Sequence, residues 1–225
     1  MMTDNRRIII TGASSGLGKN LYDAFSKSYD VINISRTVSK SNNNIIINLE
    51  NLSELKKKLK FEKIEHSLCI LNAGTMGMLG LANKIGDEDF LKSIKINVIA
   101  SKIIIDWSIS NGCKFFIGIS SGAAIKNYDG WLNYCVTKSA FRTMIIQYQK
   151  DLPKLNFKLI SPGILKTKMN KKIKELDVSL YPDMKKFHET IAVHPKKASE
   201  IIYKKHIDFF KSSKLEIDLR NELDW

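Results

Sequence analysis

The chain has 225 residues, 44% of them hydrophobic and 26% charged, which suffices for one substantial core and predicts a single domain over residues 1–225. Twelve glycines, four prolines and no apolar run near the roughly 20 residues that span a bilayer exclude collagen-like, largely disordered and membrane-spanning proteins. We expect no secretory signal, because the polar residues 1–7 lead into an apolar stretch that is too short for a signal's core. The net charge of +13 could indicate a nucleic-acid partner, but only five of the 36 basic residues are arginine and the lysines accompany many Ile and Asn residues, so we expect no nucleic-acid and no membrane partner.

Short apolar runs alternate with longer amphipathic segments along the chain. Seven runs are typical of strands: residues 7–11, 31–35, 44–49, 67–72, 115–120, 157–161 and 214–219. The segments between them have helix length: residues 17–28, 52–59, 87–95, 98–111, 131–152 and 196–210. The strand-like runs are continuously apolar, as in a parallel sheet that is buried on both faces. The alternation therefore predicts a doubly wound α/β fold, with a mainly parallel, seven-stranded sheet covered by helices on both faces.

The first strand runs into a glycine-rich turn, Thr11-Gly12-Ala13-Ser14-Ser15-Gly16-Leu17-Gly18, and then into the first helix. Glycines here let the backbone turn tightly and approach a pyrophosphate, whose charge the helix N-terminus stabilises. The position between strand and helix, more than the glycine content, predicts a dinucleotide-binding turn. The spacing is Gly-x-x-x-Gly-x-Gly and differs from the Gly-x-Gly-x-x-Gly of common dehydrogenases.

The end of the second strand bears on the choice of cofactor. Enzymes of this architecture that use NAD place a carboxylate there, where it hydrogen-bonds the ribose 2′-hydroxyl and repels a 2′-phosphate. No Asp or Glu occurs from Val31 to Ile47, and Arg36 stands just past the strand. Because a guanidinium can clamp a phosphate, we expect NADP(H), with NAD as the less favoured alternative.

Two residues of the long helix expected over 131–152 indicate proton transfer. Tyr134 and Lys138 are separated by four positions and so share one helix face. Tyrosine is a weak acid at neutral pH, and a nearby cation stabilises its anion and brings its pKa closer to the working range. A second Tyr-x-x-x-Lys, at Tyr181, is followed directly by Pro182, which disfavours a helix there.

With these features the chain resembles the classical short-chain dehydrogenase/reductase family from Arg7 to about Thr167, and the resemblance implies a Rossmann-type fold. It implies that Ser121, thirteen residues before Tyr134, holds the substrate oxygen and that Tyr134 donates the proton. Lys138 then lowers the tyrosine pKa and grips the nicotinamide ribose. Asn97 completes the tetrad and helps a water connect Lys138 to solvent.

The same resemblance implies which residues bind the cofactor. Asn72-Ala73-Gly74 matches an element that supports the sheet near the adenosine, and Asn48 stands where the family usually has an Asp near the adenine. After the sixth strand, a threonine four residues beyond the Pro-Gly pair contacts the nicotinamide carboxamide. The implied cofactor-binding residues are Thr11, Gly12, Ser14, Ser15, Gly16, Leu17, Gly18, Arg36, Asn48, Leu49, Asn72, Ala73, Gly74, Tyr134, Lys138, Pro162, Gly163 and Thr167.

The family resemblance implies an oxidoreductase that interconverts a carbonyl and a secondary alcohol on a small molecule. Arg36 adds the expected use of NADP(H), and the scattered cysteines predict a reducing, cytoplasmic setting. A non-catalytic NADP(H)-binding regulator, or a reductase of carbohydrate precursor synthesis, stays open as an alternative. We expect no metal, because Cys69, Cys113 and Cys135 are scattered among apolar neighbours. A homodimer through the helices that carry Asn97 and Tyr134 is expected, or a homotetramer.

The segment expected to choose the substrate is a flap at about residues 166–195. It is polar, interrupts the strand–helix alternation and contains seven lysines with His188 and His194. Such a flap could attract an anionic substrate. The lysine excess of the whole chain explains the same residues equally well, so the sequence leaves the two interpretations open.

Overall fold

The computed structural model describes residues 7–37 and 44–222, so the predicted polar N-terminal segment lies, except for Arg7, outside the described residues. Seven parallel strands form one sheet in the order β3-β2-β1-β4-β5-β6-β7. The strands are β1 (Arg7–Thr11), β2 (Asp30–Ser35), β3 (Asn44–Ile46), β4 (Leu68–Leu71), β5 (Phe115–Ile119), β6 (Asn156–Ser161) and β7 (Glu216–Asp218). This arrangement confirms the predicted doubly wound, Rossmann-type fold.

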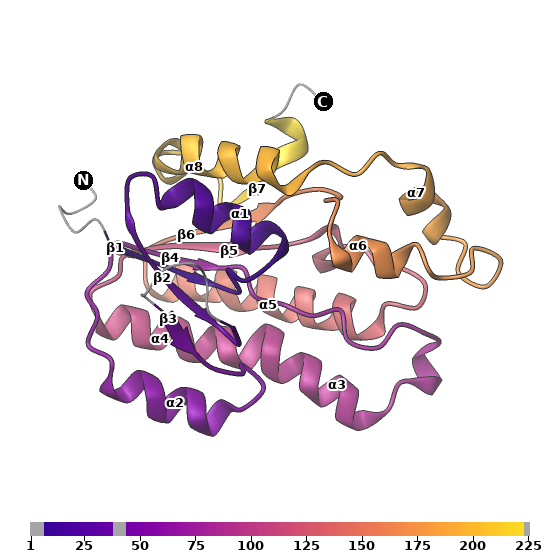
Figure 1. Ribbon diagram of the computed structural model, residues 1–225, viewed down its shortest axis with the longest axis horizontal. Helices are drawn as coiled ribbons and strands as arrows, with labels where there is room; N and C mark the ends of the chain where they lie inside the picture. Colours follow the sequence, from indigo (N-terminus) through magenta and orange to yellow (C-terminus); the bar gives the residue numbers. More distant parts are fainter. Residues whose placement is uncertain (1–6, 38–43, 223–225) are drawn as a thin grey trace.

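Helices cover both faces of this sheet (Figure 1). They are α1 (Gly16–Phe25), α2 (Leu52–Phe61), α3 (Asp87–Ile94), α4 (Ala100–Ser110), α5 (Leu132–Asp151), α6 (Lys168–Ile173), α7 (Met184–Glu189) and α8 (Pro195–Lys211). In Figure 1, α1 and α8 lie on one face, and α2, α4 and α5 lie on the other. No helix among the described residues is both long and apolar enough to cross a bilayer.

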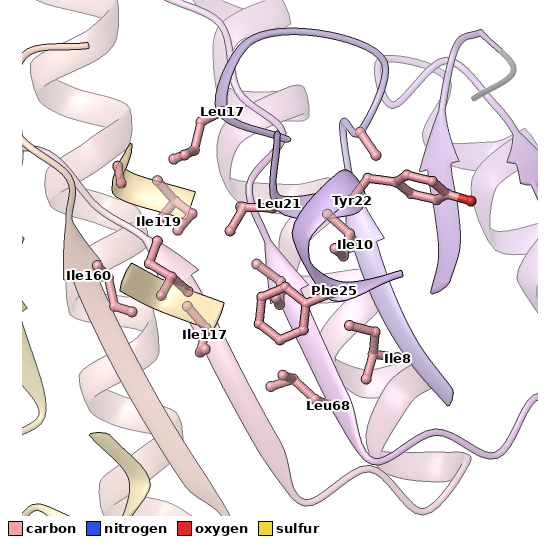
Figure 2. Close-up of a cluster of buried hydrophobic side chains, with 14 of the residues drawn as sticks. Ile8, Ile10, Leu17, Leu21, Tyr22, Phe25, Leu68, Ile117, Ile119 and Ile160 are labelled. Carbon is pink, nitrogen blue, oxygen red and sulfur yellow. The ribbon is translucent and has the colours of Figure 1, made fainter. Parts of the chain in front are cut away.

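The first strand shows why its sequence is continuously apolar. Ile8 and Ile10 pack with α1 and α8, whereas Ile9 between them packs with the helices of the opposite face, and all three are fully buried. Figure 2 shows Leu21 and Phe25 of α1 lying against the side chains of this first cluster. Each such side chain contributes about 1.5–3 kcal/mol on burial, so neither face of the strand tolerates a polar residue without loss.

Several boundaries differ from those expected. The third strand ends at Ile46 because the chain turns there: the backbone N–H of Asn51 donates to the Asn48 carbonyl at 2.9 Å. The helix expected over 98–111 is part of a longer helical run, in which a π-helical turn at Lys95–Ile99 joins α3 to α4. The sequence pattern also gave no indication of α6 and α7 within the flap.

The strand order decides where a ligand can bind. From β1 the chain proceeds outward to β2 and β3 and then returns to β4, on the other side of β1. In open α/β sheets the crevice beyond the carboxyl ends of the strands at such a reversal is the usual ligand site. The ends of β1 and β4 lead into Thr11-Gly12 and Asn72-Ala73-Gly74, which are the segments singled out in the sequence.

Candidate active site

The glycine-rich turn after β1 packs directly against the loop after β4. Gly12 has a φ of +72°, and a Cβ on it would lie 2.9 Å from the Ala73 Cα. A Cβ on Gly18 would lie 2.2 Å from the Gly12 carbonyl oxygen and 2.4 Å from the Asn72 Nδ2. The buried Thr11 hydroxyl accepts from the N–H groups of Asn72 at 3.0 Å and Ala73 at 2.9 Å. Two glycines and one threonine therefore fix the two halves of the crevice to each other.

The first turn of α1 is open to a ligand. Its N-cap residue, Ser15, makes no side-chain capping bond, and both Ser14 and Ser15 are exposed. Gly16 has a φ of +57°, and the nearest neighbour of a Cβ placed on it would be the Thr167 Cγ2 at 3.6 Å. Uncapped N–H groups at a helix N-terminus bind phosphate readily. Leu17, in contrast, is buried in the core under the turn.

A buried asparagine that the sequence analysis did not identify ties the end of β2 to this turn. The Asn33 Oδ1 accepts from the Ala13 N–H at 3.1 Å, and its Nδ2 donates to the Ser35 Oγ at 2.9 Å. Arg36 follows directly and is exposed, and the one carboxylate of β2, Asp30, lies at the opposite end of the strand, so that no Asp or Glu occurs from Val31 to Ile47. Beyond β3, the Asn48 Oδ1 accepts from the Glu50 N–H at 3.2 Å, and Leu49 is buried.

Tyr134 and Lys138 lie one turn apart on α5 and are both buried, with exposed fractions of 8% and 6%. The Lys138 Nζ lies 5.7 Å from the centroid of the Tyr134 ring and donates to the Ile119 carbonyl at 2.8 Å. Ser121 follows β5 and lies near enough to the phenol of Tyr134 to lower its pKa, while its Oγ accepts from the Ala123 N–H at 3.2 Å. The structure thus brings a serine, a tyrosine and a lysine together at the end of β5.

Burial dominates the proton affinities of this pair. It raises the pKa of Tyr134 to about 12, against the lowering effect of Ser121. It lowers the pKa of Lys138 to about 8. Burial therefore opposes the lowering of the tyrosine pKa that the sequence analysis expects from Lys138, because both groups lose solvent. The phenol therefore carries its proton at neutral pH.

Asn97 lies in the π-helical turn and connects three elements. Its Oδ1 accepts from the Thr75 N–H at 2.8 Å, and its Nδ2 donates to the Thr75 carbonyl and to the Thr137 Oγ1, each at 2.8 Å. A Cβ on Gly74 would lie 3.3 Å from the Asn97 Oδ1 and 3.9 Å from the Lys138 Nζ. The side chain of Asn97 thus holds the loop after β4 against α5, directly beside the lysine.

The segment after β6 forms the opposite wall. Gly163 has a φ of +77° after the buried Pro162, and Thr167 is the N-cap of α6, with its Oγ1 accepting from the Asn170 N–H at 3.3 Å. Since Gly16 and Thr167 are close, the two walls approach each other across the crevice. Arg36 lies farther out, at the end of β2.

A second, partly buried hydrogen-bond network was not found in the sequence analysis. The Asp89 Oδ2 accepts from the Met78 N–H at 2.6 Å and from the Asn133 Nδ2 at 2.5 Å, and Thr137 donates to the Asn133 carbonyl at 2.7 Å. It connects α3, the loop after β4 and the turn of α5 that carries Tyr134. No short motif marks these residues, because their partners are distant in the sequence.

These observations fit a dinucleotide. Gly12 and Gly18 leave no room for a side chain, the α1 terminus offers uncapped N–H groups, and Arg36 provides a cation with no carboxylate at the adjoining end of β2. The buried phenol beside a cation provides a proton donor at the other end of the crevice. The arrangement can bind a nucleotide and donate a proton to a substrate oxygen.

Comparison with known proteins agrees with this geometry. The sequence model of the family described as short chain dehydrogenase matches residues 55–177, more than half of the chain. A benzil reductase that forms (S)-benzoin, from Bacillus cereus, is 29% identical over 214 residues, covering 81% of this chain and 84% of that protein. An NAD-dependent glycerol dehydrogenase from Listeria innocua is 26% identical over 187 residues, covering 73% of this chain and 72% of that protein. A short chain dehydrogenase family protein from Francisella tularensis superposes with a TM-score of 0.78 at 20% identity, over 95% of this chain and 96% of that one.

Proposed function

This chain belongs to the short-chain dehydrogenase family, and from that premise we propose that it is an NADP(H)-dependent oxidoreductase. It interconverts a carbonyl group and a secondary alcohol on a small molecule. The observation that carries the proposal is the buried Tyr134 phenol, which lies beside Ser121 and has the ammonium of Lys138 5.7 Å from its ring centroid.

In the direction of reduction, the chain's residues act on the carbonyl oxygen. NADPH, when bound, would supply a hydride for the carbonyl carbon. Ser121 donates a hydrogen bond to the oxygen, and Tyr134 transfers its phenolic proton to it as negative charge develops. Lys138, held by the Ile119 carbonyl, stabilises the phenolate that remains until a proton returns from solvent. The products are the secondary alcohol and NADP⁺, and the consumed proton comes from water.

Asn97 acts as a positioning residue in this scheme. Its amide holds Thr75 and Thr137, so the helix turn that carries Lys138 keeps its distance from the loop after β4. We assign the relay of protons from Lys138 to solvent to a water held near Asn97.

The preference for NADP(H) rests on Arg36. It is exposed directly after β2, and a guanidinium binds the 2′-phosphate that a carboxylate at this strand end would repel. The remaining contacts assigned to the cofactor are those of the glycine-rich turn, Asn48 and Leu49, Asn72 to Gly74, Pro162, Gly163 and Thr167.

Assembly, domain organisation and compartment complete the proposal. We assign residues 1–225 to one domain, since the last strand β7 pairs with β6 in the same sheet. The chain forms a homodimer or a homotetramer. All three cysteines are buried and unpaired, in keeping with a reducing, cytoplasmic setting.

The alternative, a non-catalytic NADP(H)-binding regulator, uses the same crevice and no proton donor. Consumption of NADPH, and separately of NADH, is measured with a panel of ketones, aldehydes and keto sugars. Substrate-dependent consumption of NADPH supports the enzyme. Tight NADPH binding without consumption on any member of the panel favours the regulator.

A further inference from the structure

The inner face of the flap is apolar. Residues Ile173 of α6 and Met184 and Phe187 of α7 are buried in one cluster with Tyr134 of α5 and with Trp131, the N-cap residue of α5. Figure 1 shows α6 and α7 together at one end of the molecule, beside the sheet. Because Tyr134 is only 8% exposed, a substrate reaches its hydroxyl by replacing some of these contacts. A ligand that replaces apolar contacts has to offer apolar surface of its own.

Most of the rings in this cluster surround Trp131. The Trp131 ring centroid lies 4.8 Å from that of Phe187, 4.9 Å from that of Tyr128 and 5.9 Å from that of Tyr134. The Trp131 and Tyr134 rings meet edge to face, with an interplanar angle of 73°. These spacings are those of favourable aromatic pairs, so a planar aromatic group finds complementary surfaces beside the proton donor.

The positive charges of the flap lie in solvent, and two of them, Lys185 and Lys186, line a surface hollow with Tyr128. All seven lysines of the flap are exposed: Lys166, Lys168, Lys171, Lys172, Lys174, Lys185 and Lys186. The buried cation on α5, Lys138, is already held by the Ile119 carbonyl. A carboxylate or phosphate placed among Trp131 and Phe187 would lose its hydration without gaining a partner from the flap. The arrangement favours an uncharged substrate over the anionic one that the lysine count could suggest.

Trp131 also carries an unused donor. Its side chain is 97% buried, and the indole Nε1 has no hydrogen-bond partner among the described residues. A buried donor without an acceptor is costly, and an oxygen of a bound ligand removes that cost. Such an oxygen is distinct from the carbonyl oxygen that Ser121 and Tyr134 take.

We propose that the flap and the start of α5 bind an uncharged aromatic carbonyl compound with a second oxygen acceptor, and that Trp131 is the specificity-determining residue. The proposal rests on the reductase function above. The aromatic group lies among Trp131, Phe187 and Tyr128, and the second oxygen accepts from the indole N–H. The seven lysines of the flap take no part in binding the substrate.

Four probe compounds separate these requirements. Phenylpropanedione has an aromatic ring and two carbonyls, acetophenone has the ring with one carbonyl, butanedione lacks the ring, and benzoylformate replaces the second carbonyl with a carboxylate. Binding to the NADP⁺-loaded enzyme is measured by equilibrium dialysis, and reduction by NADPH consumption. We expect kcat/KM for phenylpropanedione to exceed that for butanedione and for benzoylformate by at least about tenfold.

Trp131→Phe keeps a ring and removes the donor. It should lower kcat/KM about tenfold for phenylpropanedione, mainly through KM, with a smaller change for acetophenone. Trp107→Phe is the matched control, because the Trp107 indole donates to the Glu62 carbonyl at 3.0 Å, away from the flap. Neutralising Lys171, Lys172 and Lys174 together should leave every KM unchanged.

The outcomes separate this inference from the function on which it rests. Binding of phenylpropanedione without NADPH consumption supports the pocket and contradicts the reductase function. Preferential reduction of benzoylformate, equal reduction of butanedione, or a raised KM in the triple lysine variant overturns the pocket and leaves the reductase function standing. Equal losses for phenylpropanedione and acetophenone in Trp131→Phe overturn the role of the indole donor. Absence of both binding and reduction for all aromatic probes overturns the proposal.

Discussion

Gly18 occupies a position that has no space for a side chain. A Cβ at Gly18, in the first turn of α1, would lie 2.2 Å from the Gly12 carbonyl oxygen and 2.4 Å from the Asn72 Nδ2. Both distances are far inside van der Waals contact. The same Nδ2 donates to the Thr11 carbonyl at 3.0 Å, so displacing it also breaks a bond between the two walls of the crevice.

Two opposing effects set the magnitude for Gly18→Ala. Alanine is favoured over glycine within a helix by about 1 kcal/mol. Overpacking costs about 1–3 kcal/mol, and the acceptor that Asn72 leaves behind costs about 1–3 kcal/mol more. The unfavourable terms exceed the favourable one, so we expect the free energy of unfolding to fall by about 2–4 kcal/mol. NADPH affinity should fall as well, because the turn moves.

Urea unfolding and NADPH fluorescence titration measure the two effects. Gly86→Ala is the matched control: Gly86 precedes α3 with a φ of −75°, and a Cβ there meets nothing within 4 Å. We expect its free energy of unfolding to change by less than about 1 kcal/mol and its NADPH affinity to stay the same. A Gly18→Ala protein as stable as the wild type and equally good at binding NADPH would refute the reasoning.

Two further predictions concern charge. Arg36→Asp should weaken NADPH binding at least about tenfold and leave NADH binding equal or better, as followed by fluorescence titration; an unchanged preference would remove Arg36 from the cofactor site. Burial lowers the pKa of Lys138 from 10.5 to about 8, so the unfolded chain holds more protons between these values and the contribution of Lys138 to stability rises with pH across that window. Lys138→Met should remove about 2 kcal/mol of that rise between pH 8 and pH 10 in urea unfolding, and an identical pH dependence in both proteins would contradict it.

The sheet could be predicted because its information is local. Ile8, Ile9 and Ile10 are all buried, two on one face of the sheet and one on the other. Because both faces are buried, every position of the strand is apolar, and the sequence shows this as a continuous apolar run. The early end of β3 and the π-helical turn depend on backbone hydrogen bonds that no residue pattern marks. The helices of the flap were missed because their apolar residues are few and spaced among lysines.

The residues of the candidate site also fall into those that the sequence predicts and those that only the structure brings together. Tyr134 and Lys138 are one helical turn apart, so their proximity follows from the sequence alone. Asn33 and the Asp89–Asn133 pair join elements far apart in the chain, and only the tertiary structure brings them together. The raised pKa of Tyr134 likewise depends on burial by the flap, which the pattern of charges in the sequence conceals.

The most direct test of the account is Tyr134→Phe in an NADPH-oxidation assay with a substrate that the wild type reduces. The substitution removes one oxygen and keeps the ring that packs at 5.9 Å from Trp131, so folding and NADPH affinity should persist. Turnover should fall at least about a hundredfold, because the proton donor is gone. A variant that retains wild-type kcat would contradict the assignment of Tyr134 and, with it, the proposed mechanism.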